Sequence, residues 1–161
     1  MKFQISTSYA VQILCYLHNN KKEVKTAQAI ADEIKCSYSF IIKIMRQLRA
    51  RGFLIAVQGR HGGYALKVPA KQISFYDVFA CMEGKPKVNR CPGNKKKLCS
   101  KKMKEECEFH KFFCHLQGNI ILQLKEMKIS DLADKMGDKV RKETCVPHWQ
   151  ETCMPEWQET G

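Results

Sequence analysis

The sequence predicts a mainly α-helical fold with a small β-hairpin, and three observations lead to this fold class. Apolar residues recur at spacings of three, four and seven along several segments, which is the period of helices buried on one side. Two short apolar runs flank a glycine-rich turn at residues 59–63, a pattern typical of a hairpin. With 161 residues and 44% hydrophobic content, the chain can bury a core as one domain, or as one domain with an appendage.

The first three predicted helices follow one another closely. Residues 3–18 carry apolar side chains along one face. Thr26 is placed to cap a second helix over residues 27–34, and Ser37 is placed to cap a third after a short turn. The apolar residues of the third helix are Phe40, Ile41, Ile44, Met45 and Leu48. Its remaining polar and basic positions are typical of a helix-turn-helix that reads DNA, although an ordinary helical hairpin with a solvated face is the alternative.

A predicted hairpin comes directly after these helices, with strands at residues 53–58 and 64–68. A helix-turn-helix followed by a hairpin is a winged helix, and a glycine-rich wing tip can approach a sugar–phosphate backbone closely. No Lys-Ser/Thr pair follows the glycines, which argues against a nucleotide-binding P-loop. The residues that we expect to contact DNA are Tyr38, Ser39, Lys43 and Arg46 in the third helix and Arg60 and His61 in the wing.

The second half of the chain begins with a capping box formed by Ser74 and Asp77, which opens a short helix that ends near Gly84. A long helix is then predicted from Glu105 to about Met127, roughly 30 Å in length. One small domain cannot cover a helix of this length, so we expect it to pack against its own copy in a two-fold homodimer. Ser130 is placed to cap a last short helix.

Positive charge is concentrated in the first two thirds of the chain. The chain carries a formal charge of +12, of which residues 1–84 contribute +7 and residues 85–104 contribute +9, whereas residues 105–161 contribute −4. A strongly basic region favours a polyanionic partner. Together with the winged-helix pattern, this charge distribution predicts binding to double-stranded DNA.

Three thiols and one imidazole stand close together at Cys91, Cys99, Cys107 and His110, with seven residues in each of the two long gaps. Thiolate and imidazole bind soft or borderline metals, so these four residues predict a metal or cofactor site. Cys107 and His110 are three apart, which places both on one face at the start of the long helix. An iron–sulfur cluster, a zinc ion and a reversible disulfide all remain open on the residues alone. A basic surface loop with incidental cysteines is the alternative without a site.

The sequence predicts no catalytic residues, because no carboxylate pair, Ser/His/Asp set or cofactor fingerprint accompanies the cysteines. No apolar run reaches the roughly 18 residues of a membrane span and no signal peptide is visible, so we expect a cytoplasmic protein without a membrane partner. The expected organisation is a winged helix-turn-helix domain at 1–84, a cysteine-containing loop at 85–104, a dimerisation helix and short terminal helix at 105–142, and a disordered tail at 143–161.

The ordered motifs resemble those of the IscR/NsrR family of winged-helix iron–sulfur transcription regulators, across about residues 1–135. In the DNA-binding half the resemblance rests on Tyr9-Ala10-Val11, Ser37-x-Ser39-Phe40-Ile41 and Gly62-Gly63-Tyr64-x-Leu66. Further along, it rests on Ile73-Ser74-x-x-Asp77-Val78, Glu83-Gly84, the three cysteines, Cys107-x-x-His110 and Ile129-Ser130-Asp131-Leu132. These motifs are specific as a set because they are ordered and span several elements.

The resemblance implies a homodimeric repressor or activator that binds a roughly palindromic operator and senses cluster, redox or nitric oxide status. It implies that Cys91, Cys99 and Cys107 ligate an iron–sulfur cluster. In the IscR branch a histidine three residues after the last cysteine completes a [2Fe-2S] site, and His110 holds that place, so a [2Fe-2S] cluster is favoured. In the NsrR branch an aspartate from the partner's first helix completes a [4Fe-4S] site, and Ser8 stands at that position here.

The chain departs from the family pattern at several positions. Both seven-residue gaps are wider than the five residues common in IscR, so a [4Fe-4S] cluster is also possible. Ile42 stands where a glutamate helps IscR-like proteins discriminate DNA sites, and Gln58, Arg60 and His61 change the wing. The operator sequence is therefore not implied by the resemblance.

Overall fold

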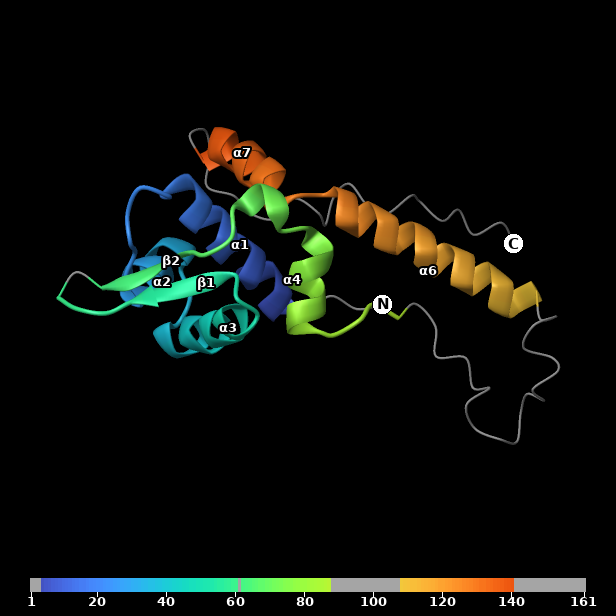
Figure 1. Cartoon of the computed structure of the whole chain (residues 1–161), viewed down its shortest axis with the longest axis horizontal. Helices are drawn as coiled ribbons and strands as arrows, with labels where there is room; N and C mark the ends of the chain where they lie inside the picture. The colour runs from blue at the N-terminus through green and yellow to red at the C-terminus, as the bar shows by residue number, and fades with distance from the viewer. Residues whose placement is uncertain (1–3, 61, 88–107, 141–161) are drawn as a thin grey trace, which may run out of the picture.

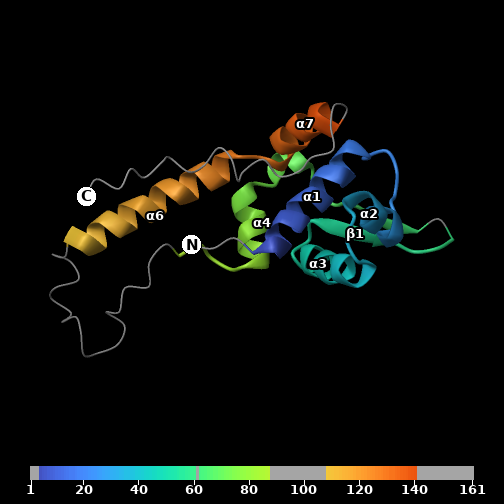
Figure 2. The ribbon, with the colours of Figure 1, turned by 180° about the vertical axis from the view of Figure 1, so that it is seen from behind.

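The computed structural model describes residues 4–60, 62–87 and 108–140 of the chain, with side chains described as far as residue 136. Within these ranges the chain forms a helical body with a two-stranded hairpin, which confirms the mainly α-helical fold class. The helix α6 (Glu108–Glu126) projects from this body (Figure 1). The tip of the hairpin and the N-terminal end of α6 lie at opposite ends of the molecule, as the view from behind also shows (Figure 2).

The helix α1 (Ile5–Asn19) lies at the centre of the body. It packs against α2 (Ala27–Ile34), α3 (Tyr38–Ala50), α4 (Phe75–Met82) and α7 (Ile129–Val140), and it also touches the hairpin. The side chains of Ala10, Ile13, Leu14 and Leu17 are at most 2% exposed. Burying a large aliphatic side chain contributes about 1.5–3 kcal/mol, so α1 anchors much of the core.

The helices α2 and α3 form the helix-turn-helix that the sequence predicts. The Thr26 hydroxyl accepts a hydrogen bond from the Ala29 amide at 3.1 Å, which confirms Thr26 as the cap of α2. Lys35 ends α2 in the left-handed region with φ of 55°. Ser37 occupies the N-cap position of α3, although its side chain makes no capping hydrogen bond. Ile41, Ile44, Met45 and Leu48 are buried as predicted.

The hairpin consists of β1 (Leu54–Val57) and β2 (Gly63–Leu66), with Leu54 opposite Leu66 and Val57 opposite Gly63. Both strands are shorter than the sequence pattern predicts. The Phe53 amide donates to the Leu48 carbonyl at 3.0 Å, at the C-terminal end of α3. Because this amide is bonded to the helix, β1 begins one residue later, at Leu54.

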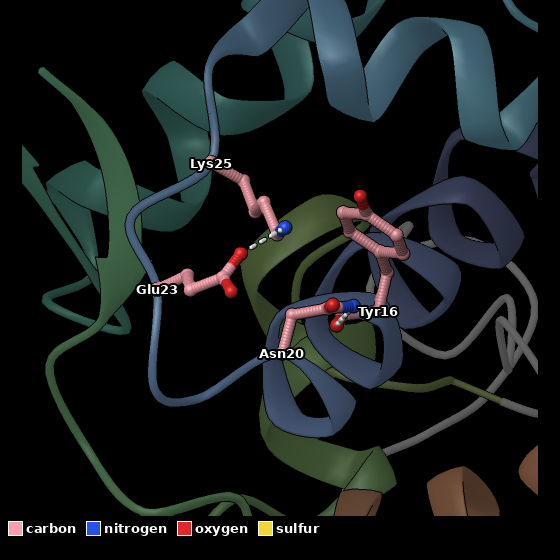
Figure 3. A network of polar contacts seen from close by, with 4 residues as sticks. All are labelled: Tyr16, Asn20, Glu23 and Lys25. Atoms are coloured by element: carbon pink, nitrogen blue, oxygen red, sulfur yellow. Dashed lines mark hydrogen bonds and ion pairs between the residues drawn. The ribbon is translucent and has the colours of Figure 1, made fainter. Parts of the chain in front are cut away.

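The loop between α1 and α2 fixes the outer side of β2. The Lys25 amide donates to the Tyr64 carbonyl at 3.1 Å, and the Tyr64 amide donates to the Lys25 carbonyl at 2.8 Å. Figure 3 shows how this loop is held: Lys25 Nζ lies 2.5 Å from Glu23 Oε2, and Asn20 Nδ2 donates to the Tyr16 carbonyl at 2.9 Å. The hydrogen bond between the Lys25 and Glu23 side chains raises the pKa of Lys25 and lowers the pKa of Glu23.

The chain passes from β2 through a short 3₁₀ turn, η1 (Ala70–Gln72), into α4. Ser74 and Asp77 form the predicted capping box, with the Asp77 amide donating to Ser74 Oγ and the Ser74 amide donating to the Asp77 carboxylate. Gly84, with φ of 84°, follows the end of α4.

Two backbone hydrogen bonds attach the base of α6 to the body. The Phe75 amide donates to the Met127 carbonyl at 2.8 Å, and the Ile129 amide donates to the Ile73 carbonyl at 3.0 Å. Because Ile129 is held in this way and is fully buried, α7 begins at Ile129. Ser130 therefore lies inside the first turn of α7, and the prediction that it caps this helix is wrong. Ile129 and Ala133 place α7 in the same core as α1.

Gly63 is sterically required where β2 meets the loop between α1 and α2. A Cβ atom there would lie 2.4 Å from the Lys25 carbonyl oxygen and 2.7 Å from the Lys25 carbonyl carbon. We predict that Gly63→Ala lowers the free energy of unfolding by about 1–3 kcal/mol, as in other overpacked sites, because the paired backbone must shift. Urea unfolding followed by circular dichroism measures this loss.

Gly118→Ala in α6 is the matched control. An added Cβ meets no atom within 4 Å at Gly118, and alanine is the better helix former by about 1 kcal/mol. This variant should be as stable as the wild type or more so. A Gly63→Ala protein that unfolds at the wild-type urea concentration would contradict the role of the Lys25–Tyr64 pairing.

Candidate nucleic-acid interface and metal-ligand residues

The outer face of α3 is polar and basic. Tyr38, Ser39, Lys43 and Arg46 are all exposed, while the opposite face of the helix lies in the core. Ser39, Lys43 and Arg46 are spaced by four and three residues, so they form one stripe of about two turns. The helix also carries Arg49 and has no acidic residue. No carboxylate on α3 therefore neutralises these basic side chains, which leaves this face positively charged and suited to a polyanion.

Contacts from two other helices fix the orientation of α3. The Phe40 ring meets the Tyr9 ring of α1 edge-on, with centroids 5.6 Å apart. At the other end of α3, the Cys81 thiol of α4 donates to the Gln47 carbonyl at 3.6 Å. Burial raises the pKa of Cys81, while Arg51 acts in the opposite direction. These contacts hold α3 as a rigid platform for its exposed side chains.

The hairpin supplies a second exposed element beside α3. Arg60 is exposed at the tip, whereas His61 lies outside the described residues. The tip is tight, since a Cβ at Gly62 would lie 2.4 Å from the Val57 carbonyl oxygen. A small glycine-rich tip of this shape allows close approach to a nucleic-acid backbone.

Of the four predicted metal ligands, His110 alone falls in the described part of the chain; Cys91, Cys99 and Cys107 lie outside it. His110 is half-buried in the first turn of α6. Its Nε2 atom lies 3.4 Å from the Sγ atom of Cys114, one turn further along the helix. Within residues 4–60, 62–87 and 108–136, no three His, Cys, Asp or Glu side chains converge on a metal position.

The cysteines that the structure describes differ in environment. Cys15 is buried, its thiol donates to the Ile129 carbonyl at 3.8 Å, and burial raises its pKa to about 11. Cys36 and Cys81 are half-buried against the core, as is common for isolated cysteines in helices. Cys114 is exposed. Cys114 is not among the predicted metal ligands, although its position four residues after His110 places both side chains on one face of a helix.

Most of α6 is left uncovered by the other described residues. No residue of α6 is buried, and Phe109, Phe112 and Leu122 are 61%, 62% and 59% exposed. The Phe109, Phe112 and Phe113 rings contact one another, with centroids 4.7 and 5.4 Å apart for the two pairs that include Phe113. None of the described helices combines the length and apolar character that crossing a membrane requires.

A helix-turn-helix with a basic outer face, followed directly by a hairpin wing, defines a winged-helix DNA-binding protein. Comparison with known families agrees with this class. The chain belongs to the Rrf2 family, described as iron-dependent transcriptional regulators, whose sequence profile matches residues 3–135. It is thus a DNA-binding transcription regulator and not an enzyme, as the sequence predicts.

Individual relatives are distant in sequence and close in fold. YffB of Lactococcus lactis, whose name assigns it to the HTH-type transcriptional regulators, is 26% identical over 129 residues, which cover 79% of this chain and 81% of YffB. CymR of B. subtilis, described as the global cysteine regulator, superposes with a TM-score of 0.68 at 18% identity over 84% of this chain and 98% of CymR. IscR of T. potens gives a TM-score of 0.62 at 18% identity over 93% and 96% of the two chains.

Proposed function

We propose that this chain is a homodimeric transcription regulator whose affinity for its operator depends on a metal centre held by Cys91, Cys99, Cys107 and His110. The observation that carries the proposal is this set of three thiols and one imidazole: the thiols follow the DNA-binding half in the sequence, and His110 lies in the first turn of α6. An iron–sulfur cluster is the favoured occupant, with [2Fe-2S] preferred and [4Fe-4S] possible. A cytoplasmic location remains a prediction.

The donor chemistry fits such a centre. Three cysteines and one histidine are a ligand set that both iron–sulfur clusters and zinc accept. His110, the described member of the set, is half-buried, and its Nε2 atom lies 3.4 Å from the Cys114 thiol. When bound, a cluster would supply a redox-sensitive group, and its thiolates would offset part of the +9 charge of residues 85–104. Membership of a family described as iron-dependent supports the same occupant.

Double-stranded DNA is the proposed target of the α3 stripe and the wing. Tyr38, Ser39, Lys43 and Arg46 would contact the groove and its phosphates, and Arg60 and His61 would contact the backbone or minor groove from the wing. In a two-fold dimer the two α3 helices would read half-sites about 34–36 Å apart, or one DNA turn.

The second copy would cover the exposed face of α6. Phe109, Phe112 and Leu122 are apolar side chains that a monomer leaves in water, and packing of two α6 helices would bury such side chains. His110 lies on the same helix, and the base of α6 packs against α4. Ligation at His110 would thus fix the position of the dimer helix relative to the body, and so the separation of the two α3 helices.

A zinc ion or a thiol/disulfide switch is the second candidate for the same residues. An exposed cysteine, Cys114, favours it, because exposed thiols are the ones that oxidants and metals reach. Colour separates the two candidates, since zinc and disulfides are colourless whereas clusters absorb visible light.

The metal centre is tested by anaerobic purification followed by iron, sulfide and zinc analysis. We predict two irons and two sulfides per chain, or four of each, and loss of most of this content in Cys91→Ser. Operator affinity should change on loading in the wild type and stay constant in Cys91→Ser, as measured by fluorescence anisotropy. Cys36→Ser is the control and should keep the metal. A colourless wild type with zinc or without metal would refute the cluster.

The α3 stripe is tested with Lys43→Ala and Arg46→Ala on an operator selected from random duplexes by the wild-type protein. Each variant should bind about 10-fold or more weakly, because a lost contact costs about 1–3 kcal/mol. Where the lost contact is to phosphate, the slope of log affinity against log salt should fall by about 0.9 per subunit. Lys111→Ala, at the far end of α6, is the control. Wild-type affinity in both α3 variants would exclude this face.

The dimer is tested with the double variant Phe109→Ala/Phe112→Ala in sedimentation equilibrium. Aromatic anchors at the centre of an interface contribute about 2 kcal/mol or more each, so loss of both should raise the dimer Kd by roughly 1,000-fold. Lys111→Ala replaces an exposed neighbour whose ion pair with Glu108 spans one turn, and it should leave the Kd unchanged. A monomeric wild type, or a double variant that dimerises normally, would contradict the role of α6.

A further inference from the structure

We infer that Ile42 is a specificity-determining residue of α3 and that it contacts the C5-methyl group of a thymine in each half-site of the operator. The inference rests on the DNA interface proposed above for the α3 stripe. It adds one apolar contact to a surface that is otherwise mainly polar and basic.

Ile42 lies on the border between the buried face of α3 and the stripe. Since each residue turns an α-helix by about 100°, Ile42 stands about 60° from Ser39 and about 40° from Arg46 around the helix axis. On its other side, Ile41 and Met45 are fully buried at 0% exposure. Ile42 itself is half-buried, so part of its side chain packs against the core while the rest reaches the surface that carries the stripe.

The position of Ile42 along the helix favours contact with bases. It is the fifth residue of α3, and a recognition helix in the major groove contacts base edges with its N-terminal residues. Tyr38 stands one turn earlier on the same side of the helix and is 50% exposed. The N-terminal half of α3 thus presents two apolar side chains beside Ser39, whereas Arg46 and Arg49 are exposed on the C-terminal half.

The chemistry of isoleucine selects thymine among the four bases. Its side chain has no donor or acceptor, so it can discriminate between bases only by apolar contact and shape. In the major groove thymine alone presents a methyl group, while the other bases present hydrogen-bonding groups that Ile42 would leave without a partner. The side chain is branched at Cβ and packs in part against the core, which limits its freedom to turn away from an unsuitable base.

The test is a deoxyuridine scan of the operator selected from random duplexes by the wild-type protein, with affinity measured by fluorescence anisotropy. Deoxyuridine in place of thymidine removes the C5-methyl group and keeps the base pair. We expect one thymine in the half-site at which this change weakens wild-type binding by about 4-fold, the effect of roughly one buried methyl group. The same change should leave the affinity of Ile42→Ala unaltered, and Ile42→Val should fall between the two.

Lys43→Ala is the control, because it removes a charge from the same face. It should bind every duplex more weakly and keep the wild-type response to deoxyuridine. Since Ile42 is only half-buried, both of its variants should keep the wild-type circular dichroism spectrum.

The scan also separates this inference from the interface on which it rests. If Lys43→Ala and Arg46→Ala bind more weakly but no thymine methyl group affects wild-type binding, the stripe stands and Ile42 does not read thymine. A methyl effect that persists in Ile42→Ala would overturn the role of Ile42 in the same way. If both basic variants bind like the wild type, the α3 interface and the role of Ile42 are overturned together.

Discussion

The structure depends above all on the burial of α1. Its residues Ala10, Ile13, Leu14 and Leu17 meet the helix-turn-helix, α4 and α7, so a single helix holds every layer of the body in place. Thr7 is a polar exception, at 1% exposure, and its hydroxyl donates to the Glu83 carboxylate. That carboxylate also accepts from the Gln4 amide at 2.9 Å. These bonds offset the cost of burying a hydroxyl and fix the end of α4 to the start of α1.

As a result, the chain is hydrogen-bonded to the body both where it leaves the body after α4 and where it returns after α6. It departs after Glu83, which is held by α1, and returns at Met127 and Ile129, which are held by Phe75 and Ile73. The cysteines at 91, 99 and 107 fall between these two points in the sequence. The described residues that flank this segment are therefore both hydrogen-bonded to the body.

Local patterns in the sequence were sufficient to predict most of the helices and the hairpin. Helical periodicity, the Thr26 cap and the Ser74–Asp77 capping box are properties of a few neighbouring residues, and the structure has them where the sequence predicts. The start of α7 could not be found in this way, because the hydrogen bond between Ile129 and Ile73 joins segments far apart in the chain. Cys114 escaped notice because it stands among the apolar residues of 112–116, where a cysteine resembles a core residue. The helical phase of α6, and its exposure among the described residues, place that thiol at the surface beside His110.

The helix α4 is the mechanical connection between α6 and the DNA-reading helix. It contacts α6 on one side and both α1 and α3 on the other, and its Cys81 thiol bonds to the Gln47 carbonyl of α3. A capping box precedes its eight residues, and Glu83 follows them as the C-cap. The Glu83 carboxylate is hydrogen-bonded to the N-terminal end of α1. A helix this short and fixed at both ends moves as a unit or not at all. A shift of the base of α6 must then either displace α4 and α3 together or break the hydrogen bonds at Phe75 and Ile129. Breaking buried backbone hydrogen bonds costs about 1–3 kcal/mol each, and this cost opposes a movement of the base of α6 that leaves α4 behind.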